Sequence, residues 1–85
     1  MKVDLRGIRH EVKFVKGMSS DCAGKWWPGV IHLRHTLAGR NLMQIALHEA
    51  LHGCQVDLNE DAVEAISLGL TDMLWALGYR RVEIA

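Results

Sequence analysis

The first 35 residues alternate between apolar and polar positions in three short runs, which is typical of half-buried β-strands. The runs are Val3–Arg6, His10–Lys16 and Val30–His35. The first two are close together and interrupted by a glycine, so we expect them to form a hairpin. Residues 17–28 carry Gly, Ser, Asp and Pro, and we interpret them as a loop. The pattern therefore predicts a small antiparallel sheet of about three strands.

From about Leu37 the apolar period changes to that of a helix. One stripe of this predicted helix consists of Leu42, Ile45, Glu49 and His52, and the neighbouring stripe of Gln44, His48, Leu51 and Gln55. Gly53 stands where a helix of this length frays or ends. The polar residues Glu49 and His52 share the face that should be buried.

A second helix is expected from about Glu60 to Leu77, with Asn59 as its N-cap and Gly78 just past its end. Its predicted core stripe is Val63, Ile66, Leu70, Met73 or Leu74, and Leu77. A second, mixed face carries Glu64, Ser67, Leu68, Thr71 and Trp75. Because the turn between the helices is short, they should pack antiparallel. The fold class is therefore α+β, with the sheet followed by two helices.

Length and composition narrow the function classes. The 85 residues are expected to form one domain, residues 1–85, small enough to benefit from a bound metal. The net charge of zero argues against a nucleic-acid partner. No apolar run reaches the roughly 20 residues of a membrane span, and the first residues do not resemble a signal peptide. With only two cysteines, we expect a reducing, cytoplasmic environment.

The sequence His48-Glu49-Ala50-Leu51-His52 carries the candidate chemistry. Histidines four residues apart lie on one helix face, one turn apart, where both can hold a zinc ion. Glu49 lies beside them at another azimuth, where it can act as general base toward the water that the metal activates. The sequence thus predicts zinc at His48 and His52, with Glu49 as the catalytic residue.

A catalytic zinc site needs a third protein ligand and an open fourth position. The candidates are Glu64, Glu60, Asp57, Asp61, His32, His35 and Cys54. A carboxylate near the start of the antiparallel second helix would face the histidines, so Glu60 and Glu64 both qualify. Glu60 is close to the cap, where it can simply complement the helix dipole. We therefore favour Glu64, a full turn into the helix.

These residues resemble the gluzincin clan of zinc metallopeptidases. In that clan the first helix provides two histidines and the general base, and a second "glutamate helix" provides the third ligand; here Val63-Glu64-Ala65-Ile66-Ser67-Leu68 is similar to its motif. The resemblance covers residues 30–80 and is especially close to small phage- and prophage-encoded peptidase-like proteins. It implies a phage- or bacterium-encoded intracellular protein with a zincin-like fold. It supports His48, His52 and Glu64 as ligands.

The resemblance also has departures and implications. Leu68 replaces the aspartate that often orients a zinc histidine, so the orienting group should be Asp61, Glu60 or a backbone carbonyl. The candidates for a transition-state donor are Tyr79, Arg80, His32 and His35. In zincins an edge strand beside the helix binds an extended substrate, a role that would fall to the strand at Val30–His35. Trp26 and Trp27 would form a cleft wall or cover the core, and Cys22 would be a buried thiol or a latency switch.

The leading interpretation is a zinc-dependent hydrolase of the metallopeptidase type that acts on a peptide or protein substrate. The alternative is a non-catalytic adaptor or regulatory protein whose two helices are stapled by zinc. A closed site with four protein ligands would favour the adaptor, and an open position in an accessible cleft would favour the enzyme. A homodimer is a further possibility for either.

Overall fold

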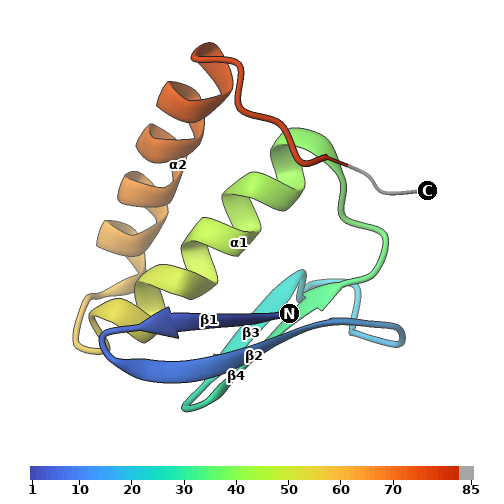
Figure 1. The fold of residues 1–85 in the computed structure, drawn as a ribbon, viewed down its shortest axis with the longest axis vertical. Helices are drawn as coiled ribbons and strands as arrows, with labels where there is room; N and C mark the ends of the chain where they lie inside the picture. Colours follow the sequence, from blue (N-terminus) through green and yellow to red (C-terminus); the bar gives the residue numbers. More distant parts are fainter. Residues whose placement is uncertain (83–85) are drawn as a thin grey trace.

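The computed structural model describes residues 1–82 and has the expected α+β architecture (Figure 1). Its elements are the strands β1 (Lys2–Leu5), β2 (Ile8–Val15), β3 (Gly24–Trp27) and β4 (Val30–Arg34), followed by the helices α1 (Gly39–Cys54) and α2 (Glu60–Ala76). The strands form one sheet, α1 lies across it, and α2 packs on α1. Among the described residues, no helix is long and apolar enough to cross a membrane.

The predicted hairpin at the N-terminus is confirmed. β1 and β2 pair antiparallel, with Leu5 opposite Ile8. The two residues between them, Arg6 and Gly7, both have positive φ, at 55° and 78°. Two consecutive left-handed residues make the tight turn whose twist matches that of the flanking strands. The turn therefore fixes the register of the first two strands.

The prediction of a loop over residues 17–28 was wrong at its C-terminal end, because Gly24–Trp27 forms β3. β3 pairs antiparallel with β4 around Pro28-Gly29, and Gly29 has a φ of 88°. Proline followed by a glycine with positive φ is the sequence of a type II turn. Two tryptophans before this dipeptide and an alternating run after it were the signal for a second hairpin.

The sheet is mixed rather than antiparallel, with four strands in the order β1-β2-β4-β3. β2 and β4 run parallel, because the chain passes to the far edge, forms β3 and returns through β4. Val30–Arg34 is consequently an interior strand, and our assignment of this segment as the edge strand beside the helix was wrong. β3 occupies that edge instead.

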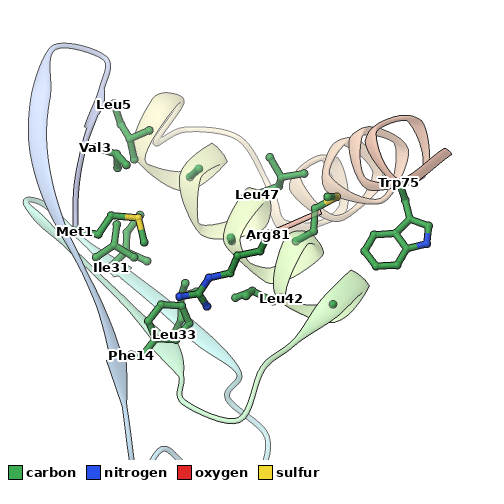
Figure 2. Close-up of a pocket in the computed structure, with 15 residues that line it drawn as sticks. Met1, Val3, Leu5, Phe14, Ile31, Leu33, Leu42, Leu47, Trp75 and Arg81 are labelled. Carbon is green, nitrogen blue, oxygen red and sulfur yellow. The ribbon is translucent and has the colours of Figure 1, made fainter. Parts of the chain in front are cut away.

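The core lies between the sheet and α1. Ile31 and Leu33 of β4 and Leu42 of α1 are buried, and half-buried apolar side chains pack around them. α1 leaves the inner face of β1 and β2 open, where an apolar cavity of about 430 Å³ lies beside Leu47 (Figure 2). Arg81, from the segment after α2, lies over the ring of Phe14 at this cavity.

The two ends of α2 agree with the sequence, but its packing does not. The Asn59 side chain accepts a hydrogen bond from the backbone N–H of Ala62, and Gly78 has a φ of 93°. The helix packs on α1 through Val63, Ser67 and Thr71, which are fully buried. Most of the predicted core stripe, namely Ile66, Leu70, Met73 and Leu77, is exposed. The prediction assumed that the most hydrophobic face of α2 is the buried one. The helix instead buries Ser67 and Thr71 of the mixed face, whose small side chains allow close approach to α1.

His10 is a buried polar residue of the sheet, with 1 % of its surface exposed. Its Nδ1 lies 2.9 Å from the carbonyl oxygen of Ile8, and the indole N–H of Trp26 lies 3.0 Å from its Nε2. A neutral imidazole with its proton on Nδ1 satisfies both contacts. The pair connects β2 to β3 across the intervening β4.

We predict that His10→Leu lowers the free energy of unfolding by about 1–3 kcal/mol, because it leaves the Trp26 N–H buried without an acceptor. Urea denaturation of His10→Leu, Trp26→Phe and the double variant measures this cost. The double variant should lose less stability than the sum of the two single variants, since neither polar group then remains unpaired. Strict additivity would show that the hydrogen bond contributes nothing.

Candidate metal centre

His48 and His52 lie one turn apart on the flank of α1 that faces the start of α2. Their ring centroids are 5.0 Å apart, and the side chains are 13 % and 21 % exposed. α1 ends at Cys54, two residues after His52, so the two imidazoles lie near the negative end of the helix dipole. The histidines predicted from the sequence are therefore placed together and reachable from solvent.

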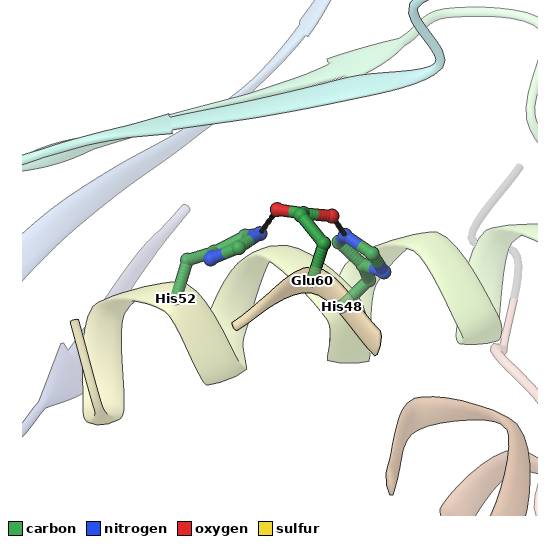
Figure 3. A group of neighbouring side chains, drawn as sticks. All are labelled: His48, His52 and Glu60. Carbon is green, nitrogen blue, oxygen red and sulfur yellow. Dashed lines mark ion pairs between the residues drawn. The ribbon is translucent and has the colours of Figure 1, made fainter. Parts of the chain in front are cut away.

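Glu60 lies between these two histidines (Figure 3). Its Oε1 is 2.8 Å from His52 Nε2, and its Oε2 is 3.3 Å from His48 Nε2. One ligand atom from each of the three residues falls within 4.8 Å of the others. Among the described residues, His48, His52 and Glu60 thus form a group that can hold a metal ion.

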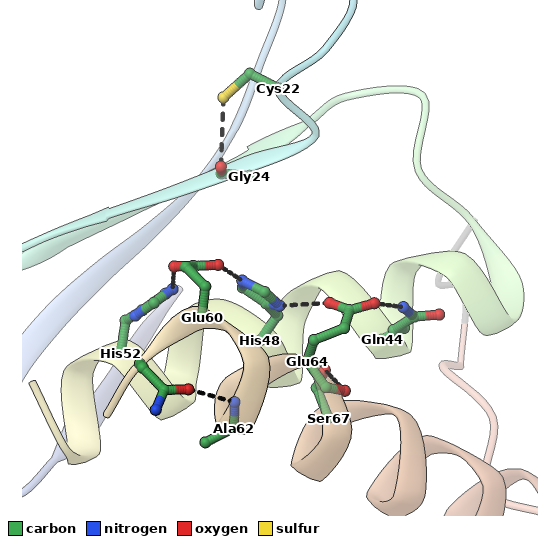
Figure 4. Close-up of polar contacts among 10 residues, drawn as sticks. Cys22, Gly24, Gln44, His48, His52, Glu60, Ala62, Glu64 and Ser67 are labelled. Carbon is green, nitrogen blue, oxygen red and sulfur yellow. Dashed lines mark hydrogen bonds and ion pairs between the residues drawn. The ribbon is translucent and has the colours of Figure 1, made fainter. Parts of the chain in front are cut away.

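Glu64, which we favoured as the third ligand, is placed on the other side of His48. Its Oε2 lies 3.2 Å from His48 Nδ1, and its Oε1 accepts a 3.3 Å hydrogen bond from the side-chain amide of Gln44 (Figure 4). The difference follows from the helix pairing. In the antiparallel pair, Glu60 is the first residue of α2 and is level with the gap between the two histidines. Glu64 is one turn further along α2, where it lies beside His48 and Gln44 of α1.

Each ring nitrogen of His48 faces a different glutamate, Nε2 facing Glu60 and Nδ1 facing Glu64. Nε2 of His48, Nε2 of His52 and the carboxylate of Glu60 are directed toward one another, while Nδ1 of His48 is directed toward Glu64. A metal-binding histidine usually donates its other ring N–H to a carboxylate or carbonyl, which fixes the ring and raises its basicity. Glu64 occupies that position, which we had assigned to Asp61, Glu60 or a backbone carbonyl.

Glu49 is buried between α1 and β3, with 7 % of its surface exposed. Burial raises the pKa of its carboxyl group, and the positive charge of His48 and His52 opposes the rise. Gly24 of β3 makes this placement possible. A Cβ at Gly24 would lie 2.7 Å from Ile45 Cγ2 and 3.0 Å from Glu49 Cγ, so a side chain there would push the strand off the helix.

A cavity of about 340 Å³ connects these groups. It is lined by His48, Glu49 and His52 of α1, Glu60 of α2, Gly24, Lys25 and Trp26 of β3, and Cys22. The sequence did not predict that Gly24, Lys25 and Trp26 line the cavity, because residues 17–28 were interpreted as a loop. Trp26 is thus one wall of the cavity, whereas Trp27 is 41 % exposed and packs edge-to-face on His32.

Apart from Cys22, the other candidates from the sequence do not line this cavity. His32 alternates with the buried Ile31 and Leu33, so it lies on the outer face of the sheet. Arg80 stacks on Trp75 near the far end of α2. Cys54 is exposed, and Asp57 accepts a hydrogen bond from Gln55. The Cys22 thiol donates to the carbonyl of Gly24 at 3.4 Å.

His35 and Tyr79 do not line it either. The His35 backbone N–H bonds to the carbonyl oxygen of Val15, and Tyr79 is 61 % exposed after the end of α2. Neither residue is positioned as a transition-state donor at this cavity in the part of the chain that the structure describes.

The burial of Glu49 leads to a pH-dependent prediction for the metal-free protein. A raised carboxyl pKa means that stability is fully present below about pH 4.5 and falls as the pH rises through the pKa of the folded state. Glu49→Gln cannot ionise, so its melting temperature should exceed that of the wild type at pH 7. Thermal melts in chelator from pH 4 to pH 8 should show the difference shrinking toward pH 4. A difference independent of pH would contradict the prediction.

No family model matches the chain, and no match was found among curated proteins or solved structures.

Proposed function

We propose that this protein is a zinc-dependent hydrolase of the metallopeptidase type, similar to a minimal gluzincin. The observation that carries the proposal is the convergence of His48, His52 and Glu60 beside the buried Glu49 in one solvent-accessible cavity. Two imidazoles and one carboxylate are the ligand set of many catalytic zinc sites, which keep a fourth position open. Bound zinc supplies Lewis acidity and lowers the pKa of water toward neutrality.

In this proposal each residue around the cavity has a separate task. His48 and His52 would hold the zinc ion through Nε2, and Glu60 would provide the third ligand oxygen. Glu64 positions His48 by accepting a hydrogen bond from its Nδ1–H, and Glu64 itself accepts a hydrogen bond from the side-chain amide of Gln44. Glu49 takes the proton of the attacking water and later gives it to the leaving amine. A carboxyl group whose pKa is raised by burial is better matched to proton transfer near neutral pH.

The edge strand provides the proposed binding surface for an extended peptide. Within residues 1–82, β3 pairs with β4 on one side and with no strand on the other, so its free side presents backbone groups next to the cavity. An extended segment can add to such an edge through main-chain hydrogen bonds. Lys25 and Trp26 of the same strand line the cavity, which places the added segment close to Glu49.

One observation favours the alternative of a zinc-stapled, non-catalytic protein. α2 contacts α1 but no strand among the described elements, and two of its three buried residues are the small polar Ser67 and Thr71. His48 and His52 on α1 and Glu60 on α2 would join the two helices through a metal. Such a link would add stability to a weakly apolar interface even without catalysis.

We predict that the protein binds one zinc ion per chain and that Glu60 matters more than Glu64. Glu60→Gln should weaken zinc binding by at least about 100-fold because a ligand is lost, and Glu64→Gln by roughly 10-fold to 100-fold because only the orientation of His48 is lost. Isothermal titration of the matched pair measures both. A larger loss in Glu64→Gln would make Glu64 the ligand, as the sequence motif indicates. Absence of zinc binding in the wild type would refute the metal site.

We further predict that Glu49→Gln keeps one zinc per chain and loses peptide hydrolysis, by about 10²-fold or more. Metal analysis and cleavage of a denatured protein substrate or a mixed peptide library, followed by mass spectrometry, measure the two properties separately. Activity that survives in Glu49→Gln would remove Glu49 as the base. A zinc-loaded wild type that cleaves no faster than its chelator-treated form would support the stapled alternative instead.

A further inference from the structure

α2 exposes a continuous apolar stripe on the flank that does not contact α1. Its large members are Ile66, Leu70, Met73 and Leu77, which are 40 %, 42 %, 61 % and 65 % exposed. They follow one another at spacings of four, three and four residues, so they lie along one line of the helix. Exposed apolar side chains are common singly, but a line of them over about three helical turns marks an interaction surface.

Small residues accompany this stripe at intervals of seven. Ala62, Gly69 and Ala76 lie along its outer margin. A Cβ at Gly69 would meet nothing within 4 Å, so the space outside the middle of the helix is open. A seven-residue repeat keeps its positions on one side of a helix over several turns. The surface therefore combines a ridge of large side chains with a parallel row of small ones.

We propose that this surface is the interface of a homodimer in which the two α2 helices pack antiparallel about a two-fold axis next to Gly69 and Leu70. Under this symmetry Leu70 packs on the partner's Gly69, Leu77 on the partner's Ala62, and Ile66 on the partner's Met73. Each ridge then enters the row of small residues of the other helix. An isologous interface needs a surface that is complementary to itself, and the sequence of α2 has this property.

The size and charge of the surface suit a second copy of this chain. The four half-exposed side chains present roughly 300–400 Å² of apolar surface. Two copies that bury this stripe with its margins would remove on the order of 1,000 Å², near the lower bound for a specific interface. None of the seven positions is charged, and the net charge of the chain is zero, so two copies do not repel each other. Antiparallel helix dipoles add a small attraction.

The proposed dimer is independent of the metal centre. Glu60 and Glu64 leave α2 toward His48, whereas the stripe lies on another flank of the same helix. Both copies would keep their cavities accessible to solvent. A failed test of zinc binding or hydrolysis would therefore leave this inference standing, and a monomeric protein would leave the proposed function standing.

Sedimentation velocity of the full chain from about 5 to 500 µM tests the proposal, with an expected dissociation constant in the micromolar range. Leu70→Glu should be monomeric throughout, because it places a charge beside the axis. Leu68→Glu is the matched control: the same change on the same helix, at a residue with 40 % exposure on a different face, should still dimerise. A monomeric wild type, or equal behaviour of the two variants, would overturn the proposal.

Crosslinking tests the register and remains informative if Leu70→Glu does not fold. With Cys22 and Cys54 replaced by serine, Ile66→Cys combined with Met73→Cys should give covalent dimers under mild oxidation. Ile66→Cys alone should give far fewer, because the antiparallel register separates it from its own copy by about 10 Å along the axis. Equal crosslinking by the single variant would indicate parallel helices and refute the two-fold arrangement.

Discussion

The burial of a carboxyl group between α1 and β3 is the constraint on which the rest of the structure depends. Glu49 lies in the same helical stripe as the core residue Leu42, so α1 cannot cover the sheet without covering Glu49. Removing a carboxylate from water is costly, and the raised pKa of Glu49 reflects that cost. Glycines permit the close approach: a Cβ at Gly24 would collide with Ile45, and one at Gly53 would lie 2.7 Å from Leu5 and 2.9 Å from the Trp26 indole nitrogen. A fold selected only for stability would place an apolar residue at position 49.

The position of α2 along α1 determines the role of each glutamate. His48 has a carboxylate at each ring nitrogen, Glu60 at Nε2 and Glu64 at Nδ1, and only the first is shared with His52. Displacement of α2 by one helical turn would bring Glu64 to the place of Glu60 and carry Glu60 away from His48. The Asn59 cap makes Glu60 the first residue of α2, and the short connection from Cys54 leaves little freedom in the pairing. The helix start, rather than a motif within the helix, therefore decides which carboxylate faces both histidines.

The elements with strong local patterns could be predicted from the sequence, whereas their pairing could not. The N-terminal hairpin, the two helices and the Asn59 cap follow from alternation, period and capping chemistry. β3 is only four residues long and was assigned to a loop because of the glycines and serines before it. The parallel pairing of β2 with β4 depends on the path of the chain through β3, which no local pattern records. In the candidate site, the spacing of His48 and His52 predicts that they lie together on one face of α1. Which of Glu60 and Glu64 faces both histidines depends on the register between the two helices, which the spacing does not determine.

The largest discrepancy concerns α2, and it explains why one helix bears two surfaces. Hydrophobicity alone predicts that Ile66, Leu70, Met73 and Leu77 face the core, yet Ser67 and Thr71 do. Their hydroxyls donate to the carbonyls of Glu64 and Ser67 within α2, so burying them leaves no polar group unpaired. Small residues at this contact bring α2 close enough to α1 for Glu60 and Glu64 to reach His48. A helix packed through its large apolar residues would lie further away and turn both glutamates from the histidines. The exposed stripe is thus the consequence of a packing that assembles the candidate metal centre, and it leaves α2 with apolar surface for a second chain to cover.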